Sequence, residues 1–251
     1  MNLLLAEAGE IDGEGLLELR DDRLRHLRRV LRVEAGARLR VGEIGGRIGE
    51  AIVLDIDDSH ARLHVELDRD PPEPLPVELV LALPRPKMLR RILRSVTEAG
   101  VKRIHLINSY RVEKSYWQSP LLAPRQLRRY LRDGLEQAQD TILPEVFLHR
   151  RFRPFVEDEL QARLRVLGSA AALLADPGSE RAYPAVPTHP AVVLIGPEGG
   201  FIPFERELLI ASGAAPVHLG ERVLRVETAV LACLGRHLAG GSQSAVSLAS
   251  R

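Results

Sequence analysis

The stretch AVVLIGPEGGF, residues 191–201, decides how the chain is interpreted. Its first five residues are apolar, which is typical of a strand buried on both faces of a sheet. The next five, Gly196 to Gly200, combine three glycines with a proline and a carboxylate. A surface turn between two elements seldom needs more than one glycine. Because glycine lacks a side chain, this loop lets backbone groups approach a ligand or another segment closely.

A second loop of the same kind follows at HLGERVLRVETA, residues 218–229. Gly220, like Gly196, comes directly after a predicted strand and before a predicted helix. In parallel sheets, ligands bind outside the carboxyl ends of the strands, so we expect both loops on one functional rim. On the glycine pattern alone, two tight strand-to-helix turns stay open as the alternative.

The C-terminal two-thirds of the chain alternates strand and helix patterns. This alternation predicts an α/β domain over residues 78–241, with a largely parallel sheet and helices on its faces. The predicted strands are 77–83, 103–109, 146–150, 171–176, 191–196 and 216–220, and the predicted helices are 87–100, 124–140, 155–168, 203–213 and 227–240.

The first seventy residues favour a small β-barrel, with strands at 15–20, 37–43, 46–57 and 61–68. One helix is predicted at 21–33, where Leu24, Leu27, Val30 and Leu31 recur at helical spacing. Residues 71–77 then read as a linker, because Pro71, Pro72, Pro74 and Pro76 do not suit a helix or a central strand. Residues 242–251 are predicted to be a frayed tail.

The composition is that of a globular protein, with 45% hydrophobic and 27% charged residues among 251. No apolar run approaches the ~20 residues of a membrane-spanning helix, and we expect no secretory signal at the N-terminus. The single cysteine, Cys233, lies in an apolar helical pattern and is expected to be a buried, unreactive side chain. With no internal disulfide possible, we expect a cytoplasmic location.

Several familiar site patterns are missing from the sequence. It lacks the dinucleotide fingerprint G-x-G-x-x-G, the phosphate-binding G-x-x-x-x-G-K-[ST] and the G-x-S-x-G nucleophile turn. Its eight histidines are scattered, and no Cys/His set has metal-ligand spacing, so we predict no metal.

Positive charge is concentrated locally although the net charge is only +1. Residues 85–133 hold thirteen Lys or Arg against three acids, and residues 23–40 hold seven arginines against Glu34 alone. This distribution favours local anion-binding faces, although solvated helix surfaces would show the same pattern. Aromatic residues make up only 4%, so recognition of a nucleic acid by extended base stacking is not expected.

Together, IGPEGGF with Glu205 and the later LGERVLRVETA closely resemble the paired C-terminal motifs of the SPOUT methyltransferases. Within that superfamily, the chain most resembles the family that methylates uridine N3 in small-subunit (16S) ribosomal RNA. Lys87 and TEAGV (97–101) are similar to its first catalytic-domain helix. Its N-terminal and mid-chain motifs are matched at His26, Val30, Leu31, Arg32, Glu136, Gln137 and Pro144.

The resemblance implies a C-terminal α/β trefoil knot, one of the rare exceptions to unknotted topology, and a PUA-like RNA-binding barrel over residues 1–70. It implies a homodimer through the knot region, with 16S rRNA of the small ribosomal subunit as partner. It further implies S-adenosylmethionine bound in the knot by Leu194, Ile195, Gly196, Pro197, Gly199, Gly200, Leu219, Gly220, Val223 and Leu224.

Two residues of the loops are candidates for catalysis. Arg225 would stabilise the developing uracil anion through its oxygens, or it would form a structural ion pair with Glu227 or Glu198. Glu198 would orient the substrate, or it would hold its own loop through backbone amides. The residues expected to contact RNA are His26, Arg29, Arg32, Lys87, Arg90, Arg111 and Arg222.

Two positions depart from the family pattern. Many members carry a basic residue where Ser95 stands, and an arginine where Asp140 stands. These departures bear on the RNA-binding face more than on the cofactor loops. Alternative functions are therefore a SPOUT enzyme with another target (ribose 2′-O or transfer RNA) and a catalytically silent ribosome-assembly module.

Overall fold

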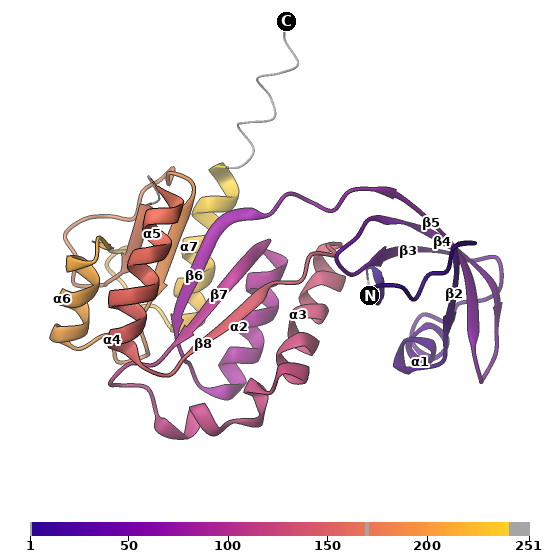
Figure 1. The fold of residues 1–251 in the computed structure, drawn as a ribbon, viewed down its shortest axis with the longest axis horizontal. Helices are drawn as coiled ribbons and strands as arrows, with labels where there is room; N and C mark the ends of the chain where they lie inside the picture. Colours follow the sequence, from indigo (N-terminus) through magenta and orange to yellow (C-terminus); the bar gives the residue numbers. More distant parts are fainter. Residues whose placement is uncertain (1, 169–170, 241–251) are drawn as a thin grey trace, which may run out of the picture. The chain divides into compact units, whose positions relative to one another are not determined.

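A computed structural model of the chain describes residues 2–168 and 171–240. The tail predicted at 242–251 lies outside the described residues. The chain divides into two compact units (Figure 1). The first unit comprises residues 1–73 with 131–143, and the second comprises residues 74–130 with 144–251.

The first unit is built on a five-stranded sheet of order β1-β3-β4-β5-β2. Strand β1 runs parallel to β3, and the other pairs are antiparallel. Alternate residues of β4 point inward, so Ala51 and Val53 join Leu17 and Leu63 in the core. The strands are β1 (Leu4–Ala6), β2 (Leu16–Leu19), β3 (Arg38–Glu43), β4 (Ile48–Ile56) and β5 (Ala61–Arg69).

Helix α1 (Asp22–Arg29) is shorter than the helix predicted at 21–33. The Asp21 side chain accepts a hydrogen bond from the Arg23 backbone N–H and so caps its start. The helix ends early, and Arg32 has a left-handed φ of 50°. Val30 and Leu31 are consequently 65% and 40% exposed, whereas Leu24 and Leu27 are buried as their spacing indicates.

Residues 131–143, which the sequence analysis placed in the second domain, belong to the first unit. They include the end of helix α3 (Pro124–Ala138). Leu135 is fully buried in a cluster with Leu3, Leu5 and Ile48, and this packing explains the assignment. The short strand β1, which the sequence analysis did not predict, supplies part of that cluster.

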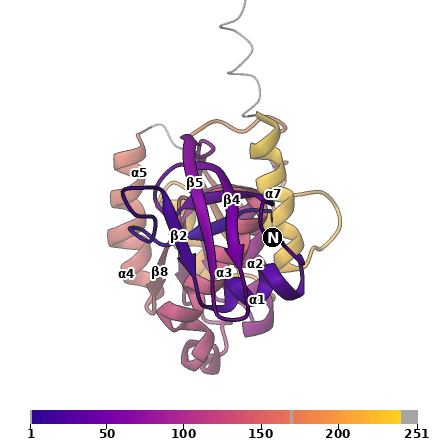
Figure 2. The same cartoon turned by 90° about the vertical axis from the view of Figure 1, so that its right-hand side faces the viewer.

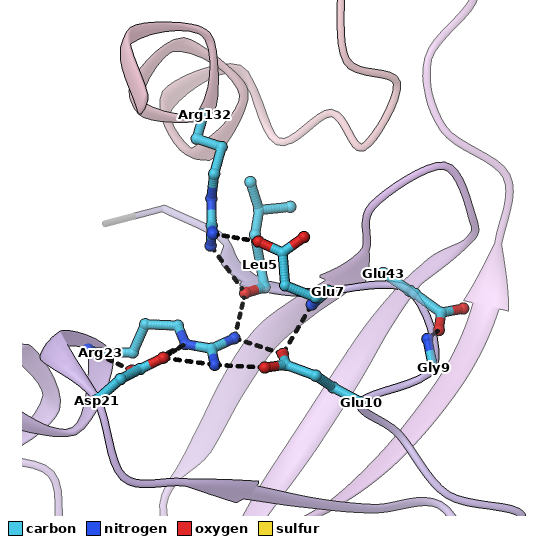
Figure 3. Close-up of polar contacts among 8 residues, drawn as sticks. All are labelled: Leu5, Glu7, Gly9, Glu10, Asp21, Arg23, Glu43 and Arg132. Atoms are coloured by element: carbon cyan, nitrogen blue, oxygen red, sulfur yellow. Dashed lines mark hydrogen bonds and ion pairs between the residues drawn. The ribbon is translucent and has the colours of Figure 1, made fainter. Parts of the chain in front are cut away.

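Two arginines fasten β1 within this unit (Figure 3). The Arg23 guanidinium donates to the Leu5 carbonyl at 2.9 Å and to both carboxylate oxygens of Glu10 at 2.6 and 2.8 Å. Arg132 donates to the same Leu5 carbonyl at 3.3 Å and to Glu7 at 2.5 Å. One backbone carbonyl therefore joins α1 and the end of α3 to β1.

The second unit is a six-stranded sheet of order β11-β9-β10-β6-β7-β8, parallel throughout, as the alternating pattern predicts. Helices α4 and α5 cover one face, while α2 and α7 cover the other (Figures 1 and 2). The strands are β6 (Leu75–Ala82), β7 (Val101–Ile107), β8 (Glu145–His149), β9 (Ala171–Ala175), β10 (Ala191–Ile195) and β11 (Ala215–Val217).

The helical segments of this unit follow the predicted order. One continuous helical stretch begins with α4 (Phe152–Pro154), passes through a π-helical turn, η3 (Phe155–Leu160), and ends in α5 (Gln161–Leu167). The others are α2 (Pro86–Glu98), the 3₁₀ turns η1 (Lys114–Gln118) and η2 (Pro120–Leu122), α3, α6 (Pro203–Ala211) and α7 (Val226–Gly240).

Pro76 is part of a central strand, contrary to its assignment to a linker at 71–77. Its position explains why the sheet tolerates it. The ladder between β6 and β10 begins one residue later, at Val77, and the register with β7 is irregular between Leu75 and Glu78. The proline therefore occupies the start of β6, where its missing N–H interrupts no regular pairing.

Candidate active site

The register of the second sheet brings four strand ends together. Ile195, the last residue of β10, lies opposite Ala175 of β9 and Leu81 of β6. Val217, the last residue of β11, also lies opposite Ala175. Because the strands are parallel, the loops that follow them emerge at one edge, as the sequence analysis expects.

A cavity of about 860 Å³ lies at this edge. This size is within the range of small-molecule and cofactor sites. Both glycine loops contribute to its wall, and of the ten residues expected to hold the cofactor only Leu194 does not line it. Leu194 is instead fully buried in β10. The lining includes Met88, Leu174, Asp176, Ile195, Gly196, Pro197, Glu198, Gly199, Gly200, Arg206, Leu219, Gly220, Arg222, Val223, Leu224 and Arg225.

The glycines of the two loops are required by backbone geometry and by close packing. Gly200 and Gly220 have φ values of +72° and +120°, where residues with side chains are strained. A Cβ on Gly196 would lie 3.1 Å from the Phe201 ring. One on Gly199 would lie 3.0 Å from Cδ of Arg111. Side chains at these four positions would therefore distort the wall of the cavity.

Glu205, in the first turn of α6, holds the first loop in place. It is only 3% exposed. Its carboxylate accepts hydrogen bonds from the Tyr110 N–H at 2.7 Å, the Ser109 hydroxyl at 3.2 Å and the Ile202 N–H at 3.2 Å. Glu205 therefore joins the start of α6 to the segment that follows β7, which gives a structural role to a residue that the sequence singled out only as part of a motif.

The charged residues around the cavity fall into paired and unpaired groups. Arg206 forms an ion pair with Asp176 at 2.6 Å. Glu198 lies 3.8 Å from the Arg85 guanidinium, and within residues 2–168 and 171–240 its carboxylate accepts no backbone amide hydrogen bond. The structure thus lacks the backbone tie considered for Glu198.

Arg225 is exposed and lines the cavity. In the described part of the chain, no carboxylate lies within 4.0 Å of its guanidinium, so the ion pairs considered with Glu227 and Glu198 do not form. The Arg225 side chain also makes no hydrogen bond with any residue of 2–168 and 171–240. The guanidinium is therefore available to a ligand.

Asp176, Arg206 and Met88 line the cavity, although the sequence analysis did not select them. Asp176 directly follows β9, so the rule that ligands bind beyond the carboxyl ends of parallel strands would have found it. Met88 lies in the first turn of α2, and no local motif marks it.

The residues expected to bind RNA lie in both units. In the first unit, Arg29 and Arg32 are exposed, whereas His26 is half-buried. Its Nε2 is buried and has no hydrogen-bond partner in the part of the chain that the structure describes. In the second unit the exposed members are Lys87, Arg90, Arg111 and Arg222, of which Arg222 lines the cavity. Arg111 donates to the Gly199 carbonyl.

Asp140 is not part of an exposed face. It is 3% exposed, and its carboxylate accepts a hydrogen bond from the Ile142 N–H at 2.9 Å. An acidic side chain here therefore stabilises a local turn in the first unit. This corrects its interpretation as an altered RNA contact.

Cys233 is fully buried in α7, and burial raises the pKa of its thiol to about 12. The expectation of a buried side chain is confirmed, and the raised pKa disfavours the thiolate, which is the reactive form. Across the described residues, no group of three or more His, Cys, Asp or Glu side chains could hold a metal ion. No helix in the same residues is both long and apolar enough to cross a membrane.

Comparisons with known proteins identify the family. Residues 71–238 match the RNA methyltransferase domain, and residues 19–66 match the RNA methyltransferase PUA domain. The ribosomal RNA small subunit methyltransferase E of Treponema pallidum is 34% identical over 92% of this chain and 88% of its own length. The chain belongs to this methyltransferase family. A protein of the same description from Synechocystis is 31% identical over 89% of this chain and 73% of its own length.

Solved structures of similar fold agree with this membership. A probable rRNA methyltransferase from Porphyromonas gingivalis has a TM-score of 0.75, with 26% identity over 97% of this chain and all of that one. A methyltransferase from Legionella pneumophila, solved with S-adenosylmethionine, has a TM-score of 0.74, with 24% identity over 95% and 97% of the two chains. The family and the PUA-like domain expected from the sequence are thus confirmed.

Proposed function

We propose that the chain transfers a methyl group from S-adenosylmethionine to N3 of a uridine in small-subunit (16S) ribosomal RNA, in the cytoplasm. The observation that carries this proposal is the cavity lined by both glycine loops, with Arg225, which has no ion-pair partner among the described residues, on its wall. The relatives that bear the name ribosomal RNA small subunit methyltransferase E support the RNA as substrate.

The cavity residues fit the proposed cofactor. Gly196, Gly199, Gly200 and Gly220 leave backbone groups open to a ligand, and Leu219 and Leu224 supply apolar surface beside them. The Neisseria gonorrhoeae relative of similar fold, with a TM-score of 0.74 and 20% identity over 94% of this chain and 95% of that one, was solved with S-adenosylmethionine. When bound, this cofactor supplies an electrophilic methyl group on a sulfonium.

The chain's own residues have two tasks in this reaction. Uridine N3 is a weakly acidic imide within the Watson–Crick edge, so the enzyme must expose that edge and favour the deprotonated base. The Arg225 guanidinium, which has no partner within residues 2–168 and 171–240, would donate to the uracil oxygens and stabilise the negative charge that develops there. Alignment of the base by the rigid loops would supply much of the remaining rate.

We place RNA phosphates on the exposed basic side chains of each unit. Arg29 and Arg32 belong to the PUA-like domain, and Lys87, Arg90 and Arg222 belong to the α/β unit. Contacts of this kind give affinity that falls steeply with salt. Arg111 of the α/β unit would also contact RNA phosphates, while it donates a hydrogen bond to the Gly199 carbonyl.

We also propose that the two glycine loops thread into a trefoil knot and that the chain forms a homodimer, as the family resemblance implies. Helix α7 begins beside the cavity, and Leu231 and Leu238 on this helix are each 49% exposed. They lie two turns apart on one side of the helix, which suits an apolar contact between copies. Sedimentation analysis of the double variant Leu231→Glu, Leu238→Glu would test the dimer, which charged side chains in this apolar contact should dissociate.

Binding of S-adenosylmethionine, measured by calorimetry, tests the cofactor site. Gly196→Val would push a side chain into Phe201, and Gly220→Val would strain the second loop, so each should weaken binding at least tenfold. Gly13→Ala is the control, because a Cβ there meets nothing within 4 Å and φ is ordinary. Absence of saturable binding by the unaltered chain, or equal affinity in all variants, would overturn the assignment.

A further inference from the structure

Tyr110 presents a large aromatic surface to solvent just beyond the end of β7. The residue is 80% exposed. Within residues 2–168 and 171–240 its ring stacks on no other ring and lies under no cation. Such exposure leaves a large apolar area in water, and it is therefore a candidate for contact with a ligand.

The backbone that carries this ring is held on both sides. The Tyr110 N–H donates to the buried carboxylate of Glu205 at 2.7 Å, and the Ser109 hydroxyl donates to the other oxygen at 3.2 Å. On the other side, Arg111 donates to the Gly199 carbonyl in the wall of the cavity. The ring is thus displayed from a fixed backbone that is bonded directly to the first glycine loop.

Arginines lie at the same edge of the sheet as this segment. Strand β7 pairs with β8, and the Asn108 N–H donates to the His149 carbonyl at 2.8 Å, so Arg150 and Arg151 emerge at the same edge of the sheet. Both arginines are exposed, and the Arg150 guanidinium lies 5.2 Å from the centre of the Trp117 ring. An exposed aromatic ring among arginines suits a nucleic acid, whose bases stack and whose phosphates pair with cations.

We propose that the Tyr110 ring stacks on a nucleobase of the RNA substrate next to the cavity. This inference rests on the proposed function, since it takes the substrate to be RNA. A single ring agrees with the low aromatic content of the chain, which does not favour an extended stack. Because every base has a π-face, Tyr110 would contribute affinity and position without reading the identity of the base.

Steady-state methylation of small ribosomal subunits from a strain without this activity provides the first test. Tyr110→Ala should raise KM for the subunits between about fivefold and a hundredfold, with kcat and the affinity for S-adenosylmethionine unchanged. Tyr110→Phe should behave as the unaltered chain, because it keeps the ring. Val166→Ala, at a residue 74% exposed on α5, is the control.

Fluorescence provides a test that does not depend on turnover. The fluorescence of the tryptophan introduced by Tyr110→Trp should be quenched when the variant is saturated with a short oligouridylate. The fluorescence of the tryptophan introduced by Val166→Trp should not change. The unaltered chain sets the baseline, because its one tryptophan, Trp117, is only 8% exposed.

The outcomes separate the two proposals. Normal KM for Tyr110→Ala in an active enzyme, or no quenching of Tyr110→Trp, overturns the stacking inference and leaves the proposed function standing. Quenching in a chain that methylates no subunit supports the stacking and contradicts the proposed reaction. Weaker binding of Tyr110→Ala to assembled subunits, with unchanged binding to protein-free RNA, would mean that the ring contacts a ribosomal protein and would overturn the inference.

Discussion

Two arginines, one in each unit, lie in opposite surroundings. In the first unit, Arg23 has every side of its guanidinium occupied by Glu10, Asp21 and the Leu5 carbonyl (Figure 3). In the second unit, Arg225 lines a cavity and has no such partner among the described residues. An arginine side chain therefore stabilises the fold at position 23 and is available to a ligand at position 225.

Burial explains the difference. The Arg23 side chain is 12% exposed, so its charge is tolerable only with partners. Burial alone would lower its pKa, but the hydrogen bonds that it donates to Glu10 and Asp21 raise the pKa above the ordinary value. Arg225 is exposed, so its charge needs no partner within the chain. The contacts that an arginine makes within the chain, more than the sequence motif around it, therefore indicate whether it stabilises the fold or is available to a ligand.

The largest effect is expected at Arg225. Arg225→Ala should lower kcat for methyl transfer between about a hundredfold and a thousandfold, because a donor aimed at developing charge is lost. The melting temperature of this variant and its affinity for S-adenosylmethionine should not change, since the Arg225 side chain makes no ion pair or hydrogen bond with the described residues. Arg225→Lys should be intermediate. A large drop in melting temperature would show that Arg225 belongs with the structural arginines.

The second unit also contains structural arginines, Arg103 and Arg163, which pair with Glu78. A substitution of Glu78 therefore tests their role. Burial would raise the pKa of Glu78, but contacts with His105 and Arg163 lower it to about 2. The stabilisation is present above the ordinary pKa of about 4.5 and is lost as pH falls toward 2.

Glu78→Gln should therefore lower the free energy of unfolding by about 3 kcal/mol at neutral pH, and the difference should vanish near pH 2. Thermal unfolding across this range provides the measurement. Glu157→Gln, which alters only an exposed pair with Arg153, is the control. A difference that does not depend on pH would contradict the assigned ion pairs.

Removal of Arg23 probes the first unit. Arg23→Leu should cost about 2 kcal/mol of unfolding free energy, because Glu10 and the Leu5 carbonyl lose their donor. Arg25→Leu on the same helix should cost less than about 0.5 kcal/mol, since Arg25 and Asp22 are 65% and 88% exposed. Urea titration of both variants gives the comparison, and equal losses would remove the distinction based on burial.

The smallest effect is expected at Glu205. Glu205→Gln keeps one acceptor oxygen but turns an amide toward a donor, so the unfolding free energy should fall by about 1 kcal/mol. KM for RNA should rise as well, because the Tyr110 backbone loses its anchor. Glu207→Gln, at an exposed position of the same helix, should change neither quantity.

The sequence predicts the arrangement of the second unit well because its signals are local. Apolar runs such as 191–195 mark buried strands, and the glycines after them mark the edge where the cavity forms. Local sequence patterns do not predict contacts between segments that are distant in the sequence. Nothing near Leu135 indicates that it packs beside Leu3 and Leu5, and no local pattern predicts β1.

The candidate site shows the same division. Gly196 and Gly220 could be selected from sequence, because close packing against Phe201 favours glycine at the first and a φ of +120° favours it at the second. The roles of Glu198, Glu205 and Arg225 depend on which side chains lie within a few ångströms. The sequence pattern therefore leaves an ion pair and a catalytic role equally open for Arg225, and the geometry of the described residues excludes only the ion pair.

Methyl transfer from labelled S-adenosylmethionine to small ribosomal subunits, from a strain that lacks this protein, tests the central claim most directly. The labelled RNA would be digested to nucleosides and the product identified by mass spectrometry. We predict N3-methyluridine, lost in Arg225→Ala. A methyl group on ribose or on another base, or no incorporation despite intact cofactor binding, would contradict the proposed reaction.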